Sequence, residues 1–197
     1  MMRHERLFRD RAGVATVEFA MVMPVFLLAL VGCLDLGQMV YAIGVLDGAV
    51  EKAARDSTLE TGNTTTADAA VTSAVEEILP GAQITSTRKS YFDFAHAKKG
   101  EPLDDANGDG LCSPGESYTD ENGSNSYDDD LGVAGNGGAN DVIVYTVTVK
   151  YDPVFSIPFI PLDWSRRTIS STAVKRNQPY ALQDGSYSSS PKFCPTQ

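Results

Sequence analysis

Residues 14–34 read VATVEFAMVMPVFLLALVGCL, and this stretch decides the architecture of the chain. It carries a single charge, Glu18, and no charge at all from Phe19 to Leu34. A helix needs about 20 predominantly apolar residues to cross the hydrocarbon core of a bilayer. A core helix of a 197-residue protein would be amphipathic, whereas this run is apolar on every side. We therefore predict a single membrane-spanning helix.

The charges on the two sides of this run predict its orientation. Residues 1–11 read MMRHERLFRDR and contain four arginines, whereas the whole chain has 16 basic and 26 acidic residues and a net charge of −10. Basic residues flank membrane helices on the cytoplasmic side. We expect a single-pass protein of the inner (cytoplasmic) membrane, with its N-terminus in the cytoplasm and the bulk of the chain in the periplasm or outside the cell.

Three kinds of segment fit this pattern. One is a plain signal anchor, and another is a lipoprotein signal, because LVGC at residues 30–33 fits a lipobox. The third is a prepilin-type leader, residues 1–13, which is cut between Gly13 and Val14 before the apolar run. A carboxylate such as Glu18 costs about 2.5–3.5 kcal/mol inside a membrane helix. The ammonium group of a new N-terminus would neutralise Glu18, which favours the prepilin-type leader.

The residues after the apolar run argue against the lipoprotein signal. A lipoprotein continues as a flexible polar tether, but apolar residues here keep helical spacing well beyond Cys33. No proline occurs between Pro24 and Pro80. We expect one helix over residues 14–58, first in the membrane and then as a stalk, with a kink or local break at Pro24.

At these residues the sequence resembles a known family. The basic leader, GVATVEF at residues 13–19, the apolar run with its proline, DLG at residues 35–37 and Tyr41 are similar to the TadE-like minor pseudopilins of tight-adherence (Flp-type) pilus systems. Near the other end, TVTVKYDPVF and TISSTAVKRNQPY are also similar to the close of such proteins. Type II secretion pseudopilins carry a similar leader, so the leader alone does not distinguish a pilus system from a type II secretion system.

The resemblance implies how the N-terminal residues act. A prepilin peptidase would cleave between Gly13 and Val14, and Glu18 would serve subunit assembly. The implied partners are other pilus subunits, inner-membrane assembly proteins and membrane lipid. The implied function is non-catalytic: assembly or regulation of the pilus.

The rest of the chain predicts a small α+β head over residues 59–178. Apolar spacing predicts a second helix from Asp68 to Leu79, which Pro80-Gly81 would stop. Alternating and β-branched stretches predict an antiparallel sheet, with strands at residues 82–94, 141–151 and 167–175. Residues 179–197, rich in Ser, Tyr, Pro and Gly, are expected to be a flexible tail.

An acidic segment at residues 101–130 carries the second chemical signal. It contains ten acidic residues and no basic one, and its spacing satisfies the calcium-loop pattern D-x-[DN]-x-[DN]-G-x5-E. Calcium prefers oxygen ligands, which alternate residues of such a loop supply, and a final glutamate gives two oxygens. The predicted ligands of this Ca2+ site are Asp105, Asn107, Asp109, the Leu111 carbonyl and Glu116.

A second, degenerate copy of the pattern begins at Asp120 and Asn122, but it lacks the final glycine. Prolines at positions 102 and 114 flank the first loop, so it lacks the two helices of an EF-hand. The alternative to a calcium site is an acidic insertion that is only solvated. Cys112 and Cys194 lie outside the apolar run and could pair in an oxidising compartment, or pair between molecules, or stay free.

Composition and motifs exclude several function classes. An acidic chain without a basic patch is a poor nucleic-acid ligand. The chain has two histidines and no G-x-S-x-G, phosphate-binding glycine loop or H-E-x-x-H motif, so we expect neither an enzyme nor a small-molecule substrate. The hypothesis that remains beside the pseudopilin is a membrane-anchored periplasmic calcium-binding adhesion or scaffold module with an uncleaved anchor.

Overall fold

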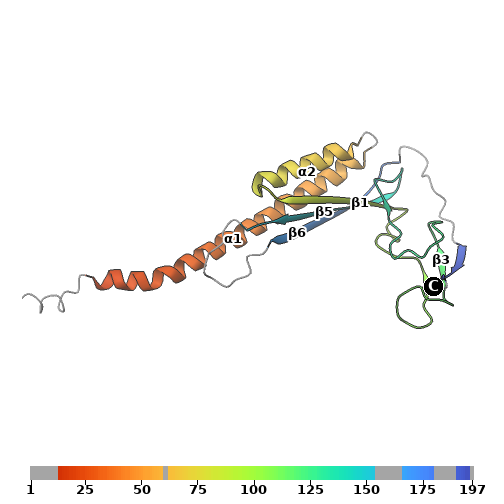
Figure 1. Ribbon diagram of the computed structural model, residues 1–197. Helices are drawn as coiled ribbons and strands as arrows, with labels where there is room; N and C mark the ends of the chain where they lie inside the picture. The colour runs from red at the N-terminus through yellow and green to blue at the C-terminus, as the bar shows by residue number, and fades with distance from the viewer. Residues whose placement is uncertain (1–12, 60–61, 154–165, 180–189, 196–197) are drawn as a thin grey trace, which may run out of the picture.

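The computed structural model describes residues 13–59, 62–153, 166–179 and 190–195. A long helix leads into a head in which two helices cover one face of a four-stranded sheet, and a smaller lobe lies at the far end (Figure 1). The elements are α1 (Val14–Ser57), α2 (Thr64–Ile78), β1 (Gln83–Tyr91), β2 (Leu103–Asp104), β3 (Ser117–Asp120), β4 (Val133–Ala134), β5 (Val142–Tyr151), β6 (Arg167–Arg176) and β7 (Ser190–Phe193).

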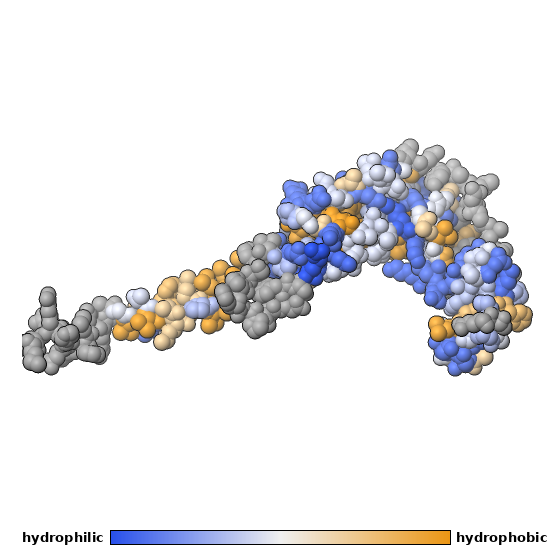
Figure 2. Space-filling view, viewed as in Figure 1, coloured by the Kyte–Doolittle hydropathy of each residue, from blue (hydrophilic) through white to orange (hydrophobic). Residues whose placement is uncertain are grey.

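Helix α1 is continuous over 44 residues and passes through Pro24 without a break. Its first half is exposed: the side chains of Phe19, Met21 and Val25 are 62%, 75% and 68% accessible. The most apolar 18-residue window has a mean hydropathy of 2.3, and none of it is buried in the protein. The hydrophobic colours of this half contrast with the mainly hydrophilic head (Figure 2). This helix therefore fits a single-pass membrane anchor.

The second half of α1 is a core helix of the head. Its buried residues recur at helical spacing and define one face: Asp35, Ala42, Leu46, Val50, Ala53, Ala54 and Ser57. This face packs against α2, β5 and β6, so the helix joins the head at Asp35 instead of holding it away on a free stalk. The single-pass helix, the second helix and the antiparallel sheet confirm the predicted α+β fold.

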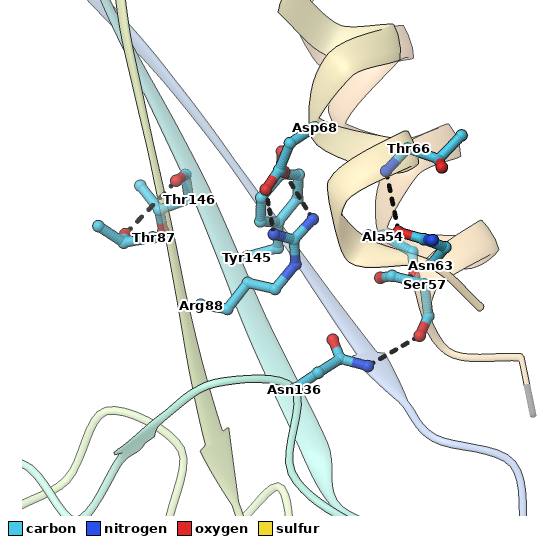
Figure 3. Close-up of polar contacts among 10 residues, drawn as sticks. All are labelled: Ala54, Ser57, Asn63, Thr66, Asp68, Thr87, Arg88, Asn136, Tyr145 and Thr146. Atoms are coloured by element: carbon cyan, nitrogen blue, oxygen red, sulfur yellow. Dashed lines mark hydrogen bonds and ion pairs between the residues drawn. The ribbon is translucent and has the colours of Figure 1, made fainter.

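Helix α2 begins at Thr64, four residues before the predicted start at Asp68. The reason is the cap: the Asn63 side chain accepts a hydrogen bond from the Thr66 amide at 3.1 Å (Figure 3). Ala67, Val71 and Val75 are its buried residues and belong to the same core as the buried face of α1.

The main sheet is antiparallel, in the order β4-β1-β5-β6. The central strand β5 turns Tyr145, Val147 and Val149 toward the helices, and each is fully buried. Val142 and Val144 belong to a second, small apolar cluster with Tyr91 and Leu131. Because side chains alternate along a strand, the period of two that predicts this strand also divides it between two cores.

Two ion pairs join α1 to the edge strand β6. Arg167, the first residue of β6, donates to the Asp35 carboxylate at 2.5 Å, and the Lys175 ammonium lies 2.6 Å from Glu51. The Asp35 side chain is only 10% exposed, whereas that of Glu51 is 52% exposed. The first pair is therefore buried against the helix, and the second is open to water.

A polar cluster fixes α2 to the sheet. Arg88 of β1 donates to both oxygens of Asp68 at 2.7 Å, and the Tyr145 hydroxyl donates to Asp68 at 2.5 Å (Figure 3). The Arg88 guanidinium also lies 3.9 Å from the centre of the Tyr145 ring. Burial raises the pKa of Asp68, but the hydrogen bonds from Arg88 and Tyr145 and the Arg88 charge outweigh it, so the net pKa is lowered.

We predict that Asp68→Asn destabilises the head by about 3 kcal/mol, because it leaves the Arg88 charge buried and unpaired. Asp68 has a lowered pKa in the folded protein, so its contribution is present above the unfolded pKa of about 3.9 and is lost as pH falls through the folded pKa. The difference from the unsubstituted protein should therefore shrink below about pH 4. Urea unfolding of the purified chain in detergent, across pH, measures this.

The matched control is Glu51→Gln, which removes an exposed ion pair of the same kind and should cost less than about 1 kcal/mol. Equal costs for the two substitutions would show that the Asp68 cluster does not fix α2.

Candidate metal centre in the distal lobe

The acidic segment folds as a lobe of its own at the end of the head farthest from the first half of α1 (Figure 1). We call it the distal lobe: residues 101–131 together with 190–195. Its three-stranded sheet has the order β2-β3-β7, with Leu103 opposite Tyr118 and Ser117 opposite Phe193. Strand β7 is formed by residues that were predicted to belong to a flexible tail, because β3 offers them a pairing edge.

The first acidic loop is wound around the Asp105 carboxylate. This carboxylate accepts hydrogen bonds from the amides of Gly108, Asp109 and Gly110 at 2.7, 3.2 and 2.8 Å. The backbone hydrogen bond from Gly110 is the largest influence on Asp105, and together these bonds lower its pKa. Gly108 and Gly110 have φ of 76° and 74°, which side chains disfavour, so the glycines of the motif allow the loop to curl.

The loop brings three of the predicted ligands together. One carboxylate oxygen each from Asp105, Asp109 and Glu116 lies within 4.8 Å of the other two. Oxygens that share a calcium ion at about 2.3–2.6 Å can be no more than about 5 Å apart, so this spacing fits a common ion. None of the salt bridges among the described residues reaches these three carboxylates.

The other two predicted ligands contact the middle of the loop. Asn107 donates from its side-chain nitrogen to Asp109 at 3.0 Å, and its side-chain oxygen accepts from the Asp109 amide at 2.8 Å. The Leu111 amide donates to Asp109 at 2.7 Å. Glu116 is buried, and its two oxygens accept from the amides of Asn107 and Ser113 at 3.3 and 2.9 Å.

The second acidic loop repeats this arrangement. Asp120 accepts from the amides of Gly123 and Asn125 at 2.7 and 3.1 Å, and Asn122 accepts from the Ser124 amide at 2.8 Å. Asn125 stands where the first loop has Gly110, and its φ of 62° is in the same left-handed region. Asparagine tolerates this conformation better than most residues, which explains how the copy keeps its shape without the final glycine.

Glu101 completes the second loop, and sequence reasoning missed it. Its two oxygens accept from the amides of Glu121 and Asp128 at 3.0 and 3.1 Å, much as Glu116 bridges the first loop. Burial is the main reason that the pKa of Glu101 is raised, and the charges of Asp120 and Asp128 add to it. Glu101 precedes the loop instead of closing it, so no motif spacing signals its role. The pairing of β2 with β3 brings it there.

Cys112 and Cys194 form a disulfide that closes the lobe, with their Cα atoms 5.4 Å apart. Cys112 lies inside the first acidic loop, and the Cys194 amide donates to the carbonyl of Glu116 at 3.0 Å. The segment around Cys194 therefore holds the backbone of Glu116, the last residue of the first acidic loop. Cys33 is free and exposed on the apolar half of α1.

The N-terminal candidate residues lie at the other end of the molecule. Gly13 forms a turn just before Val14, the first residue of α1, and Glu18 is exposed in the second turn of the helix. The rest of the predicted leader, residues 1–12, lies outside the described residues. The structure therefore separates the predicted cleavage and assembly residues from the acidic loops by the whole length of the head (Figure 1).

Comparison with known proteins finds one family. Residues 13–55 match the family model TadE, described as TadE-like protein, and this confirms the resemblance predicted for the N-terminal segment. The match covers nearly all of α1 and ends before α2, so it does not extend to the sheet or the distal lobe. No curated protein and no solved structure matches the chain.

We predict that reducing the disulfide releases β7 from the distal lobe and leaves the main sheet intact, because β7 pairs only with β3 among the described strands. Amide hydrogen exchange should become faster at residues 117–120 and 190–194 in reductant, while β5 stays protected. Cys112→Ser with Cys194→Ser should reproduce the effect without reductant, and Cys33→Ser is the control. Unchanged exchange in β3 would mean that the disulfide does not hold the lobe closed.

Proposed function

We propose that this chain, with its TadE-like helix at residues 13–55, is a membrane-anchored, non-catalytic minor pseudopilin of a tight-adherence (Flp-type) pilus. The family match carries this proposal, since TadE-like proteins are associated with such pilus systems. The continuous helix with an exposed apolar first half supports it, because such a surface suits packing against lipid or other helices. Its role would be assembly or regulation of the pilus, with other pilus subunits and inner-membrane assembly proteins as partners.

In this proposal a prepilin peptidase cuts between Gly13 and Val14. The surroundings of Gly13 allow cleavage to be tested by substitution without disturbing the fold. A Cβ atom placed on Gly13 would meet no atom within 4 Å, and its φ of −95° suits any residue. A larger side chain is therefore compatible with the fold, so a loss of cleavage can be assigned to the peptidase.

Glu18 would serve assembly from within the membrane. A charged carboxylate costs about 2.5–3.5 kcal/mol at the centre of a membrane helix and still costs free energy near its end, so a counter-charge would stabilise Glu18. The new ammonium group at Val14, on the same or a neighbouring subunit, would supply it once the leader is gone. Cleavage and the role of Glu18 are thus coupled in one mechanism.

We predict that Gly13→Leu leaves residues 1–13 attached and abolishes pilus formation. The N-terminal mass of the membrane-extracted protein measures cleavage directly. Gly32→Leu is the matched control for cleavage, because Gly32 lies on α1 with the same open surroundings but away from the cleavage site. Glu18→Ala should insert at least as well as the unsubstituted chain, since the cost of burying the charge is gone, yet fail in assembly. Normal pili from both Gly13→Leu and Glu18→Ala would exclude the pseudopilin function.

The alternative function is a membrane-anchored periplasmic adhesion or scaffold module that keeps an uncleaved anchor. A type II secretion pseudopilin is a further alternative, and the head provides no feature that selects between the two machines. The mature N-terminus separates the module from both pseudopilins, since only a pseudopilin begins at Val14. The head would lie in the periplasm or outside the cell in all three cases.

We also propose that the distal lobe binds Ca2+, whichever of these functions holds. The convergence of Asp105, Asp109 and Glu116 carries this proposal, because three carboxylates in one small volume repel one another unless a cation compensates them. Asn107 and the Leu111 carbonyl would complete the first site. Asp120 and Asn122, with Glu101 as the closing carboxylate, would form the second.

We predict that calcium raises the melting temperature of the distal lobe. An ion that binds only the folded state stabilises it by about 2.7 kcal/mol at a hundredfold excess over the dissociation constant. Magnesium should replace calcium poorly, because it requires a smaller octahedral site and retains its waters. Asp109→Ala should remove most of the calcium-dependent shift, and Asp129→Ala, which lies outside the first loop, is the comparison variant and should matter less.

Glu101→Gln distinguishes the two loops. It should weaken the second site and leave the first unchanged, so a calcium titration by calorimetry should lose one of two binding steps. Identical melting of the unsubstituted protein in calcium and in chelator would reduce the acidic segment to a solvated insertion. The pilus proposal would be unaffected.

A further inference from the structure

We propose that the end of the main sheet where β5 finishes and β6 begins rests on the membrane surface, with Arg166 and Arg167 in the layer of lipid phosphates. The partner is the outer leaflet of the bilayer in which α1 is anchored. This inference rests on the membrane anchor of the proposed function. It does not depend on the pilus role or on calcium.

The length of the apolar run locates the membrane boundary. Residues 14–34 form an unbroken helix, and at 1.5 Å per residue they span about 31 Å, which is close to the thickness of the hydrocarbon core. When residues 14–34 fill the core, Asp35 lies at its outer boundary. Asp35 is also the first charged residue after Glu18.

The head meets α1 at this same boundary. Asp35 is buried against the head, and its carboxylate accepts from the Arg167 guanidinium at 2.5 Å. Arg167 is the first residue of β6, so this contact fixes the start of β6 at the level of Asp35. The headgroup layer is about 5–8 Å deep on each side of the hydrocarbon core. A strand end that touches the boundary residue of α1 therefore begins within that layer.

The exposed residues on the opposite face of α1 also indicate that Asp35 lies at the membrane boundary. Leu36, Val40 and Tyr41 follow Asp35 and are 62%, 70% and 61% exposed, on the side of the helix away from Asp35. They continue the exposed apolar surface of the anchor, and tyrosine is enriched at the membrane–water interface. The Asp35 carboxylate is paired with Arg167 on the side of α1 that faces the head. The opposite face of the helix is therefore apolar and can contact lipid.

The exposed groups at the sheet end suit a phosphate layer. Arg166 is 48% exposed and lies 3.1 Å from Asp152, which is 71% exposed. The Nε and one terminal nitrogen of Arg166 donate to Asp152 at 3.1 and 3.4 Å, so the remaining N–H groups of this exposed guanidinium are the ones that would donate to a lipid phosphate. The two arginines are balanced by Asp35 and Asp152, so the contact should not require anionic lipid.

A fluorescent reporter can be placed on β6 itself. The chain has a single tryptophan, Trp164, so Trp164→Phe combined with Thr168→Trp leaves one tryptophan next to Arg167 at an exposed position of β6. The experiment reconstitutes the full chain in phosphatidylcholine vesicles that contain lipids brominated near the headgroup or deep in the acyl chain. We expect shallow bromines to quench the fluorescence of this variant by about twofold more than deep bromines do, as at an interfacial position. Adding phosphatidylglycerol should not change the ratio.

Two matched substitutions test the role of the ion pair. Arg167→Glu opposes Asp35 with a like charge and should reduce the shallow quenching by about half. Lys175→Glu breaks the other pair between α1 and β6, which lies farther from the membrane, and should leave the quenching unchanged. Circular dichroism of both variants checks that the sheet is retained.

The outcomes separate this inference from the proposal it rests on. A chain washed from the vesicles at alkaline pH has no anchor, which overturns both. A chain that is retained, but whose reporter fluorescence is quenched by aqueous iodide and not by either brominated lipid, overturns the membrane contact alone. Equal quenching in Arg167→Glu and Lys175→Glu would show that the pair with Asp35 does not hold the sheet at the surface.

Discussion

The structure depends on one constraint: a single helix must suit two environments. The first half of α1 exposes apolar side chains all round, whereas the second half buries one face against α2 and the sheet. The change comes at Asp35, where a carboxylate on a mostly apolar helix is neutralised by Arg167. Without a flexible joint between the halves, the direction of the anchor fixes the direction of the head. The elements that pack directly on α1 are α2, β5 and β6, and they form the main body of the head.

The head uses two different ways to hold its parts together. The main sheet and its helices share an apolar core, which includes Leu46, Val50, Val71 and Val147. At the edge of this core, the ion pair between Asp68 and Arg88 joins α2 to β1. The distal lobe has little apolar core of its own. It is ordered by backbone amides that converge on carboxylates and by one disulfide. Small units with few apolar contacts commonly use disulfides or metal ions in this way.

Local patterns explain what could be predicted from the sequence. The apolar run gave α1, the alternation at residues 142–151 gave β5, and the motif at residues 105–116 gave the loop whose carboxylates converge. Each of these signals lies within one short stretch of chain. The calcium ligands themselves, Gly13 and Glu18 stay predictions.

The features that could not be predicted join residues far apart in the chain. Arg167 meets Asp35 across 132 positions, Tyr145 meets Asp68 across 77, and Glu101 reaches Asp128 across 27. No spacing rule relates such residues, because strand pairing brings them together. The strand at residues 190–193 was missed for the same reason, since β4, β5 and β6 lie between it and its partner β3 in the sequence.

The pairing of β7 with β3 also sets an order of events during synthesis. Strand β3 at residues 117–120 is made early, yet its partner at 190–193 follows the last strand of the main sheet. Closing so long a loop is entropically slow, whereas β5 and β6 are much nearer in sequence and can pair first. The main sheet can therefore form while the lobe is still open. The Cys112 thiol then stays unpaired until residues 190–195 reach β3, so the distal lobe is the last part of the molecule to form.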